Sequence, residues 1–133
     1  MAQHSLSRTE LLIGKEGLDI LKNSKVVVFG VGGVGSFTVE ALTRAGVGNL
    51  VLVDDDTVCL TNLNRQIHAT YNTISKVKVD GMKERVVCIN HKCNVITDQA
   101  FVTPENITDF ITDYFDYVVD VIDTVFSKIA LAK

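Results

Sequence analysis

The sequence predicts an α/β fold built on a doubly wound parallel sheet, and two observations support this. Four short runs consist almost entirely of apolar residues, which is typical of strands buried on both faces. Stretches long enough for helices separate these runs, as expected of βαβ units. The predicted strands are residues 25–30, 49–53, 94–99 and 117–123. Right-handed crossovers give the spatial order third, second, first, fourth, which is a Rossmann-like arrangement.

The predicted helices follow from the spacing of apolar residues and from end signals. Leucines at roughly helical spacing over residues 8–22, interrupted by Gly14 and Gly17, indicate one or two short helices. A later helix stops at Gly46, and another begins near Pro104, a residue suited to the first helical position. The helices expected after the strands cover residues 34–46, 76–91 and 104–115, and a last one begins at residue 124.

These elements divide the chain in two. Residues 1–24 form an expected N-terminal helical segment, and residues 25–133 form one Rossmann-like nucleotide-binding domain. The helix after the fourth strand leads to no further strand, whereas such sheets commonly have five or more. We therefore expect about four parallel strands with flanking helices, in a domain that is truncated at its C-terminal end.

Composition narrows the possible function. The formal charge of −3 argues against a wholly electrostatic binder of nucleic acid, and no apolar run approaches the roughly 20 residues of a membrane span. Three cysteines without a paired CxxC spacing favour a reducing, cytoplasmic setting over a disulfide framework or a zinc site. Cys88 is expected in the core, and Cys59, in an acidic loop, is not expected to be reactive.

The segment GVGGVGS, residues 30–36, is the first sign of a ligand. Gly30, Gly32 and Gly35 form a G-x-G-x-x-G pattern directly after a strand and before a helix. A phosphate has to approach backbone N–H groups at a helix N-terminus, and a Cβ atom there would block it. In this context the pattern predicts a nucleotide phosphate site, whereas alone it would indicate only a tight turn.

A carboxylate stands where the second strand ends. Asp54 lies nineteen residues after Gly35, a spacing suited to hydrogen bonds with ribose hydroxyls. Asp56 is expected to contribute to cofactor binding, and Asp55 receives no role. With the glycines alone, these residues would fit an NAD-dependent oxidoreductase.

The next segment favours a triphosphate over a dinucleotide. TNLNRQIH, residues 61–68, presents Asn62, Arg65 and Gln66, and Lys78 follows at the start of a helix. Arg65 can hold a phosphate with its planar guanidinium, and Lys78 can add a point charge. Several phosphates call for this density of donors, which predicts ATP. The plainer interpretation, a loop arginine and a solvated helix lysine, stays open at this point.

Asp123 ends the fourth predicted strand, at the edge where ligands bind in open α/β folds. A carboxylate there can hold Mg²⁺ bound to ATP, because such sites combine one or two carboxylates with phosphates and water. The alternative is an N-cap for the following helix, and one side chain can serve both purposes.

Together these motifs resemble the ThiF/MoeB/HesA superfamily of ubiquitin-activating-enzyme-like adenylyltransferases. The pattern comprises GVGGVGS, the strand leading into Asp54 and Asp56, NLNRQ, a downstream lysine and an aspartate closing a later strand. RTELLIGKEGLDILKNSKVVVFGVGGVGS, LVDDDTVCLTNLNRQIHAT and YVVDVIDTVFSKI look most like the branch of tRNA threonylcarbamoyladenosine dehydratases. The resemblance covers about residues 8–133. Family members are longer, and their second half, which in many carries a reactive cysteine, has no counterpart in this sequence.

The resemblance implies ATP-dependent activation of a carboxylate. In that branch the carboxylate belongs to a threonylcarbamoyl group on an adenosine of a tRNA, and its adenylation leads to cyclisation with loss of water. Positive groups near the α-phosphate stabilise the charge that develops there. By resemblance, the phosphates would be held by Asn62, Arg65, Gln66 and Lys78, the nucleotide lined by Gly33 and its neighbours, and Mg²⁺ held by Asp123.

Arg8 matches an N-terminal arginine that members of the family insert into the site of the partner protomer. The match implies a homodimer with shared sites. The plainer interpretation of Arg8 is a charged residue at the start of a helix.

Three other functions stay open. An adenylyltransferase acting on a sulfur-carrier or ubiquitin-like protein uses the same motifs. A non-catalytic ATP-binding fragment is suggested by the missing second half, and an NAD-dependent oxidoreductase is the weakest alternative because no hydride-site residue is evident. Residues 65–92 hold six cations and residues 93–127 hold seven acids. This segregation predicts either a basic face for tRNA or a solvated helix face.

Overall fold

The computed structural model describes residues 4–103, 105–106, 109–110 and 115–122, and these residues contain a four-stranded parallel sheet. The strand order is β3-β2-β1-β4, which confirms the predicted topology. All three pairings are parallel, and Val27 at the centre of β1 lies opposite Val51 of β2 and Val118 of β4. The strands are β1 (Lys25–Phe29), β2 (Asn49–Val53), β3 (Asn94–Asp98) and β4 (Tyr117–Asp120).

Both faces of β1 and β2 are buried, as their apolar runs require. Val27, Val28 and Phe29 of β1 are fully inaccessible to solvent. Val28 belongs to a core cluster that includes helix residues such as Met82, whereas Val27 and Phe29 pack with Phe110 on the opposite side of the sheet. Residues that alternate along one strand therefore serve two separate cores.

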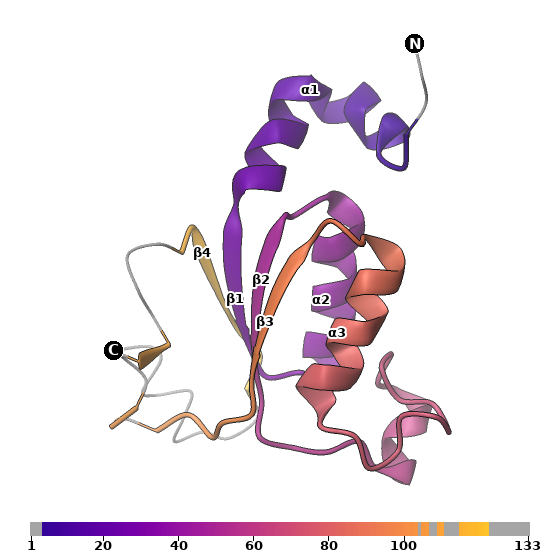
Figure 1. Cartoon of the computed structure of the whole chain (residues 1–133), viewed down its shortest axis with the longest axis vertical. Coiled ribbons are helices and arrows are strands. Elements are labelled where there is room, and N and C mark those ends of the chain that lie inside the picture. Colours follow the sequence, from indigo (N-terminus) through magenta and orange to yellow (C-terminus); the bar gives the residue numbers. More distant parts are fainter. Residues whose placement is uncertain (1–3, 104, 107–108, 111–114, 123–133) are drawn as a thin grey trace.

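Two helices cover one face of the sheet, α2 (Gly33–Ala45) and α3 (Lys78–Ile89) (Figure 1). Val79, Met82 and Val86 of α3 are buried, and Ile89 is half-buried. α2 ends as predicted at a left-handed glycine, Gly46, with φ of 102°. No helix in the described part of the chain is long and apolar enough to cross a membrane.

Two expectations about helix faces are wrong. Cys88 is exposed, because it lies on the side of α3 turned away from the sheet. Phe37 of α2, a large apolar side chain that a helix on this sheet would be expected to bury, is 52% exposed. In both cases the apolar stripe is narrower than the sequence pattern suggests, since only about one side of a surface helix meets the core.

Helix α1 (Ser7–Asn23) lies beyond the amino ends of the strands (Figure 1). It is bent at Gly14, where φ is 75°, so it consists of two short helices, one of the two outcomes left open by the sequence, and Gly17 does not interrupt it. Leu11 and Leu12 are 83% and 87% exposed, and only Leu18 of this helix is buried.

Two predicted segments fall wholly or partly outside the described residues. Of the helix expected at 104–115, the structure describes only residues 105–106, 109–110 and 115. It describes no residue of the helix expected from residue 124. Asp123 is likewise outside the described residues, and β4 ends at Asp120.

Candidate nucleotide site

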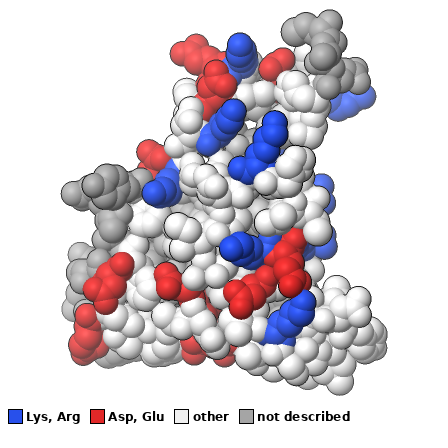
Figure 2. All heavy atoms as spheres, viewed as in Figure 1, with Lys and Arg blue, Asp and Glu red and all other residues white. Residues whose placement is uncertain are grey.

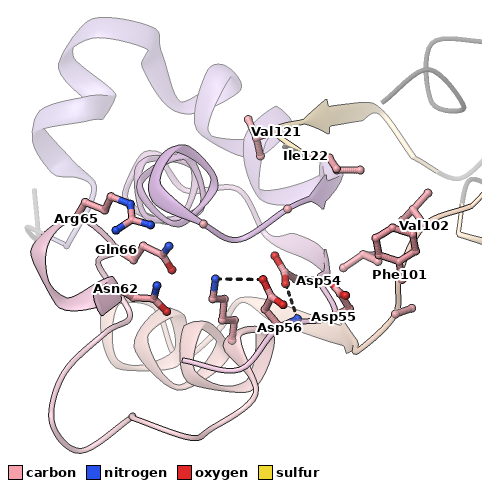
Figure 3. A pocket seen from close by; sticks show the side chains of 15 residues that line it. Asp54, Asp55, Asp56, Asn62, Arg65, Gln66, Phe101, Val102, Val121 and Ile122 are labelled. Atoms are coloured by element: carbon pink, nitrogen blue, oxygen red, sulfur yellow. Dashed lines mark hydrogen bonds and ion pairs between the residues drawn. The ribbon is translucent and has the colours of Figure 1, made fainter. Parts of the chain in front are cut away.

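A pocket of about 280 Å³ opens at the carboxyl ends of the strands, the edge where the sequence analysis placed a ligand. It is lined by Val53 at the end of β2 and by residues that follow each of the four strands. Polar side chains gather at one end of the pocket and apolar side chains at the other, with acids between them (Figure 3). The predicted residues that line it are Gly30, Gly32, Asp54, Asp56, Asn62, Arg65, Gln66 and Lys78.

Gly30 and Gly35 are required by the packing of the loop itself. Gly30 has a φ of 97°, and a Cβ atom on it would lie 2.5 Å from the carbonyl oxygen of Val121. A Cβ atom on Gly35 would lie 1.9 Å from the carbonyl oxygen of Gly30. These two glycines let the loop, the first turn of α2 and the segment after β4 approach closely.

A Cβ atom on Gly32 or Gly33 would instead make only ordinary van der Waals contacts. A Cβ atom on Gly32 would come no nearer than 3.8 Å to any neighbour, the side-chain nitrogen of Gln66. On Gly33 the nearest atoms would be those of the Arg65 side chain, also at 3.8 Å. The protein alone does not require glycine at these positions, so the missing Cβ atoms leave a cradle between the helix N-terminus and Arg65 and Gln66.

Asp54 is held by the backbone on both of its oxygens. Its Oδ2 accepts a hydrogen bond from the Val31 N–H at 2.7 Å, and its Oδ1 accepts one from the Asp56 N–H at 2.8 Å. The carboxylate therefore joins the glycine loop to the end of β2. Each carboxylate oxygen can accept more than one hydrogen bond, so this arrangement leaves acceptor capacity for a ribose.

The polar end of the pocket is built on a short 3₁₀ helix, η1 (Leu60–Asn64). Asn62 is 7% exposed, and its Oδ1 accepts the Cys59 N–H at 2.8 Å, which caps this helix. Gln66 is 5% exposed, and its Oε1 is buried without a hydrogen-bond partner among the described residues. A buried amide oxygen without a hydrogen-bond partner is costly. A ligand or a bound water in the adjacent cradle would supply the missing hydrogen bond.

The two cations of this end differ in exposure. The Arg65 guanidinium is exposed and donates to Thr61 O at 3.1 Å and Asn64 Oδ1 at 3.0 Å, which leaves further N–H groups for a ligand. Lys78 is 6% exposed, at the first turn of α3, and its Nζ lies 3.6 Å from Oδ2 of Asp56. The Asp56 side chain is 65% exposed, so it compensates a buried ammonium only in part.

Asp55 also lines the pocket, although no role was predicted for it. Burial, and then the neighbouring Asp56 carboxylate, raise the pKa of Asp55 above its usual value. Carboxylate oxygens of Asp54, Asp55 and Asp56 lie within 4.8 Å of one another. The three carboxylates repel one another at this distance, and a cationic or hydroxyl-bearing ligand beside them would reduce that repulsion.

The apolar end consists of side chains that the sequence analysis missed. Phe101 and Val102 follow β3, and Val121 and Ile122 follow β4 (Figure 3). The rule that ligands bind where parallel strands end would have found them, because each lies within four residues of a strand end. No motif marks them, since they bear no polar group.

His68 is a second residue that was missed. Its imidazole is 2% exposed, and Nε2 lies 2.8 Å from the carbonyl oxygen of Val31 in the glycine loop. Burial lowers the pKa of His68 below its usual value, although the hydrogen bond to the Val31 carbonyl oxygen opposes this shift. The adjacent Ile67 N–H donates to Oγ of the fully buried Ser36 at 3.2 Å.

Among the described residues, three predicted site residues do not line the pocket: Gly33 and Gly35 of the glycine loop, and Arg8. Arg8 is exposed on α1, at the other end of the sheet (Figure 1). Asp123 lies outside the described residues, so its expected metal-binding role stays a prediction.

Three of the six cations in residues 65–92, Lys76, Lys78 and Arg85, pair with acids. Lys76 lies 2.9 Å from Glu84, and Arg85 pairs with Glu40. Figure 2 shows Lys and Arg interspersed with Asp and Glu over one face of the molecule, instead of gathered in one patch. On this face the solvated interpretation of these cations is therefore the better one.

The chain matches the model of the ThiF family over residues 6–133. It is 54% identical over 130 residues to the tRNA threonylcarbamoyladenosine dehydratase of Bacillus subtilis, a match that covers 98% of this chain and 51% of that protein. The molybdopterin-synthase adenylyltransferase of Haemophilus influenzae is 38% identical over 110 residues, 83% of this chain and 45% of that protein.

A solved structure agrees with these matches. The Escherichia coli tRNA N6-threonylcarbamoyladenosine dehydratase TcdA in complex with ATP has a TM-score of 0.93 and 41% identity, covering 96% of this chain and 52% of that one. The chain thus spans about half the length of the curated relatives it matches. Its sequence motifs, its strand order and these similarities agree, and the chain belongs to the ThiF family.

Proposed function

We propose that this chain is the nucleotide-binding half of an ATP-dependent adenylating enzyme that acts on threonylcarbamoyladenosine in tRNA. One observation carries the proposal: Gly32 and Gly33 leave an open cradle facing Arg65 and Gln66, beside the buried Lys78. A cradle of this kind suits a chain of phosphates more than a single one. Residues 25–133 are then the ATP-binding domain, and residues 1–24 are a helical segment outside it.

The two ends of the pocket suit the two ends of ATP. The adenine base would lie against Phe101, Val102 and the residues that follow β4, and the triphosphate would lie at the polar end. Asp54 lies between these ends, where the ribose hydroxyls would be (Figure 3). The glycines at the N-terminus of α2 would let the phosphates reach backbone N–H groups.

In this proposal Arg65 and Lys78 act on the charge that develops at the α-phosphate when a carboxylate attacks it. Asn62 and Gln66 hold the phosphates in place for that attack, and Asp56 keeps Lys78 in position. Asp123 is proposed to hold Mg²⁺, which neutralises phosphate charge when bound.

The substrate is proposed from the relatives. TcdA has been solved with ATP and with AMP, and the more similar relatives are dehydratases of threonylcarbamoyladenosine in tRNA. A protein substrate, as the name of the molybdopterin-synthase adenylyltransferase suggests, is the second candidate, favoured by the 38% identity to that enzyme. Free thiols on all three cysteines agree with a cytoplasmic location.

Mg-ATP titration by calorimetry tests the nucleotide assignment. Wild-type chain is expected to bind Mg-ATP, and Arg65→Ala to bind it about tenfold or more weakly, because a charged hydrogen bond to phosphate is lost. Lys83→Ala is the matched control, since Lys83 is an exposed cation of α3 that does not line the pocket. Equal affinities in all three proteins would sink the phosphate assignment.

The substrate is tested by incubating the chain with ATP and modified tRNA and measuring the nucleosides by mass spectrometry. Loss of one water from threonylcarbamoyladenosine supports the dehydratase. Pyrophosphate release only in the presence of a sulfur-carrier protein would instead favour the second candidate. ATP binding without either product would indicate a non-catalytic nucleotide-binding unit.

We further propose a homodimer in which Arg8 reaches the partner's pocket. Helix α1, which carries Arg8, lies at the opposite end of the sheet from the pocket of its own chain, so a role for Arg8 at such a pocket requires a second copy (Figure 1). The neighbouring Leu11 and Leu12 are more than four-fifths exposed, as residues covered by a partner would be in a single copy. Sedimentation equilibrium should show a dimer that Leu12→Glu dissociates; a wild-type monomer at all concentrations would contradict this.

A further inference from the structure

The residue Val31 is held from both sides of its backbone. Its N–H donates to Asp54 Oδ2 at 2.7 Å, and its carbonyl oxygen lies 2.8 Å from His68 Nε2. Val31 itself is fully buried at the centre of the glycine loop. The loop is therefore fixed by one side chain from the end of β2 and by one from the segment that follows η1.

The chemistry of the His68 contact determines the tautomer of the ring. A carbonyl oxygen only accepts hydrogen bonds, so Nε2 has to carry the proton and donate it. Nδ1 then holds a lone pair, which agrees with its being buried without a partner among the described residues. A proton on Nδ1 would have no acceptor there, and it would place a positive charge near Lys78.

The segment that ends at His68 carries the proposed phosphate ligands. Gln66 N–H donates to the Asn62 carbonyl at 2.9 Å, and Ile67 N–H donates to Ser36 Oγ at 3.2 Å. The phosphate-binding residues 62–66 and the glycine loop thus meet through two side chains, Ser36 from α2 and His68 from the segment itself. Arg65 is exposed, so its place beside Gly33 depends on how its backbone is docked.

We propose that His68 is a positioning residue of the nucleotide site: its Nε2–H donates to the Val31 carbonyl and docks residues 62–66 onto the glycine loop. This rests on the proposed function only for its effect on ATP, since the docking itself belongs to the protein without nucleotide. Arg65 and Gln66 then face the cradle at Gly32 and Gly33 before ATP arrives. Prearranged donors of this kind lower the cost of ordering the site on binding.

A plainer interpretation treats His68 as a core side chain that fills space. The two interpretations differ in which substitutes are tolerated. Gln places its amide N–H₂ near the position of Nε2 and can donate to Val31, whereas Asn places its amide near Nδ1 and cannot reach. Both substitutions remove the ring, and Asn, one methylene shorter than Gln, also leaves a larger cavity. His68→Leu, which is close to Gln in volume but has no donor, is therefore the packing control and is expected to behave like His68→Asn.

The first measurement is hydrogen exchange of the Gln66 and Ile67 amides in the full chain without nucleotide. His68→Asn is expected to speed their exchange about tenfold or more relative to the other amides of the sheet, and His68→Gln to leave it close to wild type. Equal acceleration in both variants would show that the ring only fills space and would overturn the proposal.

The second measurement compares ATP with adenosine, which lacks phosphates. His68→Asn is expected to weaken ATP about tenfold and to leave adenosine unchanged, the size of loss that one buried hydrogen bond gives. His68→Gln should bind ATP within about twofold of wild type. Equal losses for ATP and adenosine, or none in either variant, would overturn the proposal.

Failure of the proposed function has a different signature. If the wild-type chain binds no ATP while His68→Asn still selectively speeds exchange at Gln66 and Ile67, the ATP assignment fails and the docking role stands. If ATP binds but exchange is unaffected by both variants, the docking role fails and the ATP assignment stands.

Discussion

Gly35→Ala is expected to lower the free energy of unfolding by about 3 kcal/mol or more, enough to unfold much of a small domain. The new Cβ atom would lie 1.9 Å from the Gly30 carbonyl oxygen and 2.8 Å from the Gly30 carbonyl carbon. Both are backbone atoms of the glycine loop, so no side-chain rotation can relieve the overlap. Urea unfolding followed by circular dichroism measures the loss.

Gly33→Ala is the matched control for this prediction. Its Cβ atom would lie 3.8 Å from Arg65 side-chain atoms, an ordinary contact, and Ala favours a helix over Gly by roughly 1 kcal/mol. Gly33→Ala should therefore keep or gain stability while it weakens ATP binding, because the methyl group enters the cradle. If the two variants lose the same stability, the distinction drawn between the glycines is wrong.

Lys78→Met is expected to weaken ATP binding by about 2 kcal/mol, roughly 30-fold, without lowering stability. Lys78 is 6% exposed, and Met can occupy the same space without the charge. The Asp56 carboxylate that loses its partner has a side chain 65% exposed to water, so it stays solvated at little cost. Calorimetry with Mg-ATP and urea unfolding, on the same preparation, measure both effects.

Lys76→Met is the control variant for Lys78→Met. Lys76 lies two residues earlier in the chain, pairs with Glu84 at the surface and does not line the pocket. The Lys76→Met substitution removes one positive charge, as Lys78→Met does, and leaves the buried ammonium of Lys78 in place. ATP affinities that fall equally in both variants would mean that general electrostatic attraction, and not a contact by Lys78, attracts the nucleotide.

The strands were predictable because a short run that is apolar throughout is typical of a strand buried on both faces of a sheet. A run such as KVVVF can be apolar throughout only where both faces are covered, and βαβ connections then determine the strand order. The helix faces were less predictable. Cys88 and Phe37 fit the helical spacing of apolar residues and are nevertheless exposed, since spacing does not determine how wide a stripe the sheet will cover.

The polar end of the site was predictable for a different reason. Asn62, Arg65, Gln66 and Lys78 stand in a motif, and the structure places all four along one pocket. The sequence did not reveal His68, because its meaning depends on a contact across 37 residues to Val31. Phe101 and Val121 were missed because apolar side chains at a strand end look the same whether they face a ligand or a core.

The contact between Gly30 and Val121 has a consequence for how the protein is made. The segment after β4 lies so close to Gly30 that a Cβ atom there would be 2.5 Å from the Val121 carbonyl oxygen. One wall of the pocket therefore comes from residues synthesised about 90 positions after the glycine loop. On the ribosome, β1 and β2 can pair early, but the pocket stays open on one side until β4 and Val121 have emerged. The ATP that we propose binds there would stabilise the folded chain only from that moment.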